Sequence, residues 1–151
     1  MKSYRYTVVD AFTTEVLEGN ALAVFPDASD LDATTMQKIA REFNLAETAF
    51  VLPATRKDCA ATLRIFTPAK EMVFAGHPTV GSAFVLLQEG IVPKNRSAFV
   101  VEDKVGPVPI RIDSGARPMI WFARLRFAKE DVMILLSVQQ RSGWNRRTSF
   151  P

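Results

Sequence analysis

Hydrophobic and polar positions along this 151-residue chain mostly follow the short period of β-strands, interrupted by two helix-length segments. Short runs rich in β-branched and aromatic residues, bounded by glycine, proline or polar turns, predict strands. These runs are residues 4–12, 21–25, 46–53, 60–68, 71–76, 97–103, 108–114 and 118–127. Residues 138–151 show neither strand nor helix periodicity, so we expect no regular element there.

Residues 30–44 have the clearest amphipathic helix pattern. Apolar side chains recur three and four positions apart and form one stripe: Met36, Ile39, Ala40 and Phe43. Asp32 or Thr34 can cap the start of this helix, and Asn44 can cap its end. The pattern predicts a surface helix with one face on the core.

The second helix-length segment, residues 78–87, has no polar face. Its only polar side chains are those of Thr79 and Ser82. A helix that is apolar all round belongs inside a fold, and the small Gly81 would let strands approach it closely. Gly90 is a plausible stop signal. We therefore expect an α+β fold in which a mixed, strongly curved β-sheet is wrapped around a central buried helix.

Composition limits the class of protein. Hydrophobic residues make up 48% of the chain and charged residues 23%, which is typical of one globular domain. The single cysteine, Cys59, excludes an internal disulfide and a cysteine-based zinc site, and we expect no metal. No apolar stretch is long enough for a membrane span, and the N-terminus lacks a signal-peptide pattern. We expect a cytoplasmic protein that binds no membrane.

Positive charge gathers near the C-terminus. The net charge is +3, and residues 117–151 hold 7 of the 19 Lys and Arg but only 2 of the 16 Asp and Glu. A basic tail can bind nucleic acid. Aromatic residues are sparse among these charges, which disfavours single-strand binding. We expect a solvated C-terminus and no nucleic-acid partner.

The start of the buried helix is a candidate anion site. If Pro78 occupies the first helical position, the N–H groups of Thr79, Val80 and Gly81 are free and, with the helix dipole, suit a carboxylate. The only histidine of the chain, His77, precedes them and could add a hydrogen bond or a proton. A structural histidine beside a helix cap is the alternative.

Glu47 is the second unusual residue, because it is an acid in an otherwise apolar strand. It shares a face with Ala49 and Val51 by strand alternation. Burial would raise its pKa and suit it to proton transfer near neutral pH. An exposed glutamate on an edge strand, or one paired with Arg64, explains the same residues, and the residues alone leave these possibilities open.

Three segments together resemble one family. They are LEGNALAVF (17–25), IAREFNLAETAFVL (39–52) and LRIFTPAKEMVFAGHPTVGSAFVLL (63–87), in the order found in the phenazine-biosynthesis PhzF family. The resemblance covers roughly residues 4–127. It implies one lobe of a diaminopimelate-epimerase-like fold, with a second, pseudo-symmetric lobe across the active site.

The resemblance also implies roles for individual residues. Glu47 corresponds to the family's catalytic glutamate, which moves a proton between two carbons of a small carboxylate without a cofactor. His77 matches the family's active-site histidine, and Asn20 and Gly76 line the same cleft. The backbone after Pro78, at Thr79, Val80 and Gly81, would hold the substrate carboxylate. Related epimerases use a cysteine where this chain has Ala75, which excludes a two-thiol racemisation at this site.

One expected motif is missing. The family's second half carries a Gly-Asp-Pro-x-Thr-Gly-Ser stretch, and no such stretch occurs here. We therefore expect a PhzF-like lobe over residues 1–127 and an atypical, truncated or frame-altered tail over residues 128–151. Isomerase activity would then need a second lobe or a homodimer partner. A non-catalytic remnant or interaction module is the alternative.

Overall fold

The computed structural model describes residues 2–13, 17–113, 119–122 and 138–150. In chain order, the elements of this part are β1 (Lys2–Ala11), β2 (Asn20–Phe25), α1 (Ala33–Phe43), β3 (Glu47–Leu52), β4 (Ala61–Phe66), β5 (Glu71–Met72), α2 (Gly76–Gln88), β6 (Ala98–Asp103), β7 (Gly106–Asp113), β8 (Met119–Phe122) and β9 (Val138–Phe150). The predicted α+β class is confirmed, because two helices accompany one mixed sheet within the described residues.

The strands form a single sheet in the order β8-β7-β6-β4-β3-β2-β1-β9, and β5 pairs with β4 off this path. The pairs β2–β3 and β4–β6 are parallel, and the other pairs are antiparallel. Parallel neighbours need a crossover connection. α1 forms part of the crossover from β2 to β3, and α2 part of that from β4 to β6.

Two element predictions need correction, and a third extends beyond the described residues. Residues 71–76 were expected to form one strand, but β5 ends at Met72 and Gly76 already belongs to α2. Of the expected strand 118–127, only residues 119–122 are described, and they form β8. Residues 138–150 form β9, although they lack strand periodicity, because β9 pairs with β1 through main-chain hydrogen bonds that do not require alternating side chains.

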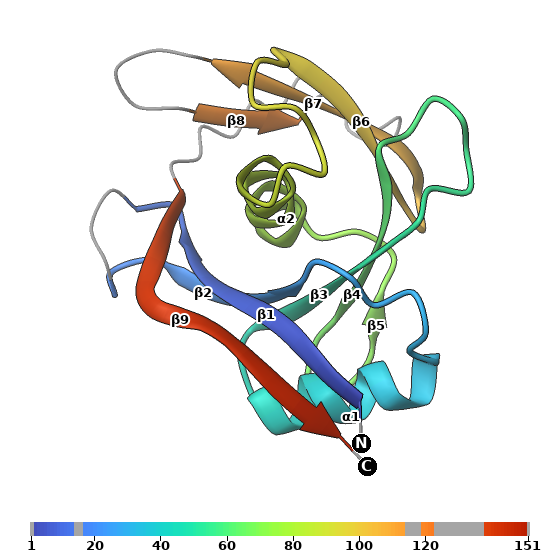
Figure 1. The fold of residues 1–151 in the computed structure, drawn as a ribbon, viewed down its shortest axis with the longest axis vertical. Coiled ribbons are helices and arrows are strands. Elements are labelled where there is room, and N and C mark those ends of the chain that lie inside the picture. The colour runs from blue at the N-terminus through green and yellow to red at the C-terminus, as the bar shows by residue number, and fades with distance from the viewer. Residues whose placement is uncertain (1, 14–16, 114–118, 123–137, 151) are drawn as a thin grey trace.

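Helix α1 covers one face of the sheet, as predicted. Its Met36, Ile39 and Ala40 are buried against β-strand residues in one hydrophobic core. The Thr35 N–H donates to the Asp32 carboxylate at 2.7 Å, which caps the start of the helix. Asn44 ends it in the left-handed conformation, at φ 49°. Figure 1 shows α1 and α2 on opposite sides of the strands β1–β4.

Helix α2 lies between two groups of strands. Figure 1 shows β1, β2 and β3 on one side of it and β6, β7 and β8 on the other. Residues 77–83, Val85 and Leu86 are buried, and most of the apolar ones belong to a second hydrophobic core. The helix ends as predicted, because Gly90 follows it at φ +73°.

Gly81 lies where α2 packs closely against β1 and β2. A Cβ at this position would lie 2.4 Å from Leu22 Cδ2 and 3.1 Å from Val9 Cγ2, and both neighbours are fully buried. We expect Gly81→Val to lower the free energy of unfolding by about 1–3 kcal/mol through overpacking. Chemical denaturation measures this loss. Gln88→Val, at an exposed position of the same helix, is the control; an equal loss in both variants would contradict the close approach.

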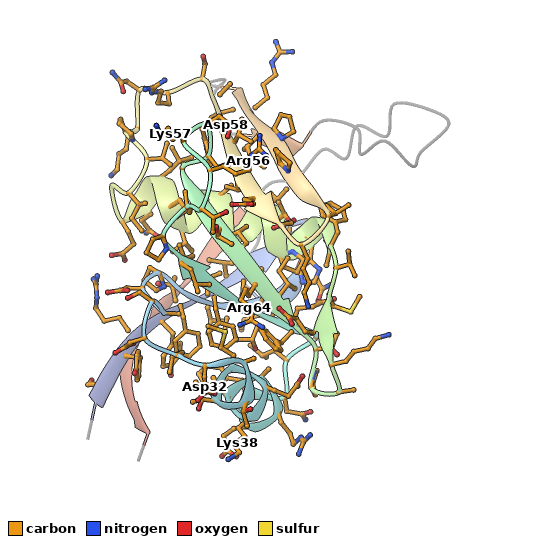
Figure 2. All side chains as sticks on the ribbon, turned by 90° about the vertical axis from the view of Figure 1, so that its right-hand side faces the viewer. Asp32, Lys38, Arg56, Lys57, Asp58 and Arg64 are labelled. Carbon is orange, nitrogen blue, oxygen red and sulfur yellow. The ribbon has the colours of Figure 1, made fainter. Side chains whose placement is uncertain are left out.

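The charged side chains labelled in Figure 2 lie outside these two cores. Figure 2 shows Arg56, Lys57 and Asp58 in the β3–β4 loop, at the other end of the molecule from α1. Arg64, on β4, donates to Glu71 at 2.7 Å and stacks over the Phe66 ring. Phe66 belongs to the core beneath α1, so Arg64 lies on that face of the sheet.

Candidate active site

Three chain segments meet at the start of α2. β2 and β3 are parallel, with Leu22 paired to Glu47, so both strands begin at the same edge of the sheet. Asn20 is the first residue of β2 and Glu47 the first of β3. The first turn of α2 brings His77 between them. The structure therefore brings together four of the predicted site residues, with Gly76 as the first residue of that turn.

His77 contacts both polar neighbours. Its Nε2 lies 3.1 Å from Glu47 Oε2, and its Nδ1 lies 3.4 Å from Asn20 Nδ2. An amide nitrogen can only donate, so Nδ1 accepts and the ring proton sits on Nε2, facing the carboxyl group. The Nε2–Oε2 approach is close but not aligned as a hydrogen bond, and among the described residues neither atom has another partner. Both atoms are thus available to a third group.

Burial sets the proton affinities of this pair. The side chain of His77 is 8% exposed and that of Glu47 is 17% exposed. Burial lowers the pKa of His77 to about 4 and raises the pKa of Glu47 above its ordinary value. A neutral imidazole therefore faces a carboxyl group that holds its proton more tightly than an exposed glutamate does. This combination suits Glu47 to accept and return one proton.

The imidazole of His77 is expected to stay neutral until the pH falls to about 4. The unfolded chain takes up this proton near pH 6.5. The buried His77 therefore lowers the free energy of unfolding as the pH falls from 6.5 to about 4. His77 is the only histidine, so a single imidazole signal in an NMR titration reports it. A midpoint near 6.5 would show a solvated ring and contradict the buried pair.

Both structural alternatives for Glu47 are wrong. The side chain is mostly buried, so it is not an exposed edge-strand glutamate. Arg64 pairs with Glu71 and lies on the other face of the sheet. Glu47 shares its face with Ala49 and Val51, as predicted, and these two residues belong to the core around α2. Strand alternation separates Glu47 from Arg64.

The helix start differs from the prediction. α2 begins at Gly76, with Ala75 as its N-cap in an extended conformation and without a side-chain cap. Pro78 is the third helical residue. Proline is tolerated at this position because the N–H groups of a first turn lack helical partners. The Thr79 N–H donates to Ala75 O at 3.2 Å and is not free. The amides that precede the helical hydrogen bonds are those of Gly76 and His77.

The remaining predicted binding residues lie deeper in the fold. Pro78, Thr79, Val80 and Gly81 are all buried within α2. The N–H groups of Val80 and Gly81 follow that of Thr79 inside the helix, so they do not form the open amide site that was predicted. Their binding of substrate stays a prediction, and in this arrangement they support the turn that carries Gly76 and His77.

Phe12 is a neighbour that sequence reasoning missed. Its ring centroid lies 5.8 Å from that of His77, and it stays 47% exposed. Phe12 has φ 66°, an uncommon conformation for a bulky residue that costs about 1–3 kcal/mol. A phenylalanine at the end of a strand carries no signal of such a backbone. Leu17 and Val73, which flank the predicted site in sequence, are also exposed apolar residues.

The described part of the chain contains no group of three His, Cys, Asp or Glu side chains placed to hold a metal ion. No helix within it combines the length and apolar character of a membrane span. Cys59 lies in the β3–β4 loop beside Asp58, beyond the end of β3 that is opposite to Glu47.

Comparisons of sequence show the family of this chain. Residues 9–128 match the PhzC-PhzF family, described as phenazine biosynthesis-like protein. An uncharacterised isomerase of Mesorhizobium japonicum is 52% identical over 108 residues, which are 72% of this chain and 35% of that protein. A trans-2,3-dihydro-3-hydroxyanthranilate isomerase of Pseudomonas aeruginosa is 44% identical over 110 residues, 73% of this chain and 38% of that protein.

Comparisons of structure find the same fold in solved proteins. A PhzF-family protein of Bacillus anthracis superposes with a TM-score of 0.74 at 32% identity, over 82% of this chain and 41% of that one. A probable proline racemase of Agrobacterium radiobacter shares the fold, with a TM-score of 0.61 at 16% identity. The chain thus spans about two fifths of the length of such proteins. Because the family match extends over residues 9–128, the chain belongs to the PhzC-PhzF family of phenazine biosynthesis-like proteins.

Proposed function

We propose that this chain forms one lobe of a cofactor-independent isomerase, in which Glu47 moves a proton between two carbons of a small carboxylate. The observation that carries the proposal is the buried contact of 3.1 Å between Glu47 and His77 at the start of α2. The named activity of the Pseudomonas aeruginosa relative is an isomerisation, which supports this reaction class.

In the proposed reaction the Glu47 carboxylate takes a proton from a carbon next to an unsaturated system. The double-bond electrons shift along the substrate, and the carboxylic acid then returns the proton to a different carbon. No electron or atom is gained or lost, so no cofactor is required. The raised pKa of Glu47 favours the protonated intermediate. His77, held neutral by burial, keeps its Nε2 facing the Glu47 carboxyl group at 3.1 Å.

Substrate binding is assigned to the helix start. The N–H groups of Gly76 and His77 precede the helical hydrogen bonds and lie at the positive end of the α2 dipole. A substrate carboxylate placed there would accept from both. Asn20, at 3.4 Å from Nδ1, fixes the imidazole tautomer. We propose a small cyclic carboxylate of the kind named for the Pseudomonas isomerases.

A second lobe is part of the proposal. The sheet that curves around α2 would be one lobe of a diaminopimelate-epimerase-like fold, and the other lobe, or a second copy of the chain, would cover the start of α2. The exposed Phe12, Leu17 and Val73 support this, because large apolar side chains near a site are usually covered in the working protein.

The test combines this chain with the complementary lobe of the Pseudomonas aeruginosa isomerase, produced separately. Mixing the two is expected to give turnover of trans-2,3-dihydro-3-hydroxyanthranilate that neither part shows alone. The chain alone is expected to show a thermal shift with a cyclic carboxylate. A soluble aggregate with neither turnover nor a thermal shift would contradict the isomerase and favour a non-catalytic remnant.

A further inference from the structure

A second buried carboxyl group contacts the first turn of α2. Asp103 ends β6 and is only 3% exposed. Its Oδ2 lies 3.0 Å from the hydroxyl oxygen of Thr79. The same hydroxyl lies 2.8 Å from the carbonyl oxygen of Ala75, the N-cap of α2. Asp103 is therefore linked, through Thr79, to the residue that precedes Gly76 and His77.

Two acceptors, Ala75 O and Asp103 Oδ2, lie within reach of the one proton of the Thr79 hydroxyl. A threonine hydroxyl carries one proton and can donate it once. The shorter contact is to Ala75, whose carbonyl can only accept. If Thr79 donates to Ala75, the proton between Thr79 and Asp103 must come from Asp103. A charged carboxylate would also leave Oδ1 buried without a partner among the described residues.

Among the described residues, no positively charged side chain contacts Asp103. Burial raises the pKa of Asp103 to about 7, and the opposing effect is the hydrogen bond with Thr79. Across the hairpin its partner in β7 is Gly106. The next residue, Lys104, directs its Nζ to Glu71 at 2.7 Å. The facing part of α2 contributes Thr79, and β8 carries no ionisable residue in its sequence.

We propose that Asp103, as a neutral acid, is a positioning residue that fixes the first turn of α2 through Thr79 and Ala75. The assignment rests on the proposed function in one respect, namely that this turn presents Gly76 and His77 to a substrate. When Asp103 loses its proton, Thr79 must turn its hydroxyl toward the carboxylate and release Ala75. The geometry of the helix start therefore responds to pH around neutrality.

The test is NMR on the isotope-labelled full chain, with two signals as readouts: the Asp103 carboxyl carbon and the imidazole of His77, the only histidine. Asp103→Asn keeps a donor toward Thr79, and Thr79→Ser keeps the hydroxyl. Both are expected to retain the imidazole signals of the native chain. Asp103→Ala and Thr79→Val are expected to shift those signals, while backbone signals of α1 stay in place.

The pH dependence separates positioning from a merely structural role. In the native chain the His77 signals are expected to change as the pH rises through 7, and in Asp103→Asn they are expected to stay constant. The free energy of unfolding also depends on the ionisation of the Asp103 carboxyl group. The unfolded chain releases this proton near 3.8 and the folded chain near 7, so the native chain loses stability as pH rises between these values. Asp103→Asn is expected to lack this loss.

Two results would overturn the proposal. One is an Asp103 carboxyl signal that is already ionised at pH 5. The other is an unchanged His77 imidazole in Thr79→Val or Asp103→Ala; if Asp103→Ala does not fold, Thr79→Val against Thr79→Ser decides. None of these measurements requires turnover. They therefore test the role of Asp103 independently of the isomerase activity of the two-lobe mixture.

Discussion

Glu47→Gln is expected to lower turnover of the two-lobe mixture by about 10²–10⁴-fold, the range contributed by a positioned general acid or base. Glutamine has the size of glutamate but cannot accept and return a proton in this reaction. The contact with His77 is kept, because the amide oxygen can face Nε2 in place of Oε2. Substrate affinity is therefore expected to change little. Turnover and a thermal shift with bound carboxylate measure the two properties separately.

Glu42→Gln is the matched control, since it is the same chemical change at an exposed position on α1. It is expected to have native turnover. If Glu47→Gln kept native turnover as well, Glu47 would not be the proton-transfer group. If it lost both turnover and folding, its role would be in stability, as a buried polar group of the core around α2.

Phe50→Ala is expected to have the largest effect on stability, a loss of about 3–5 kcal/mol. Phe50 is fully buried between the sheet and α1. Its ring stacks on Phe25 at a centroid distance of 5.0 Å and meets the edge of Phe66 at 5.6 Å. Such a loss is a large part of the roughly 5–15 kcal/mol that holds a domain folded. Chemical denaturation measures it.

Phe50→Leu is the control for this prediction. Leucine fills part of the same space, so a smaller loss is expected. Phe50 follows Glu47 on β3 by three residues and faces α1, on the side away from His77. The leucine variant should therefore keep its binding of a cyclic carboxylate. A loss below about 1 kcal/mol in Phe50→Ala would contradict the packing described for this core.

Local patterns predicted much of this structure. The stripe and caps of α1 were correct, because Asp32 and Asn44 act within one turn of their own positions. The prediction that Glu47 shares a face with Ala49 and Val51 was correct, because alternation is a property of the strand itself. The prediction that α2 is buried was correct, because a helix that is apolar all round is stable only inside a fold.

Features that depend on residues far apart in the chain could not be predicted from the sequence. The contact between Thr79 and Asp103 joins residues 24 positions apart, and neither residue carries a local signal of it. The exact start of α2 escaped because proline is accepted at several positions of a first turn, so Pro78 marked the turn but not its first residue. β9 escaped because its pairing with β1 is a main-chain interaction.

The central claim is that Glu47 is held in a buried site that raises the pKa of its carboxyl group. Titration of its side-chain carboxyl carbon by NMR, in the full chain, tests this directly. The account predicts a midpoint above the ordinary value of 4.5, because burial disfavours the charged form. A midpoint at or below 4.5, like that expected of a solvated glutamate, would contradict it.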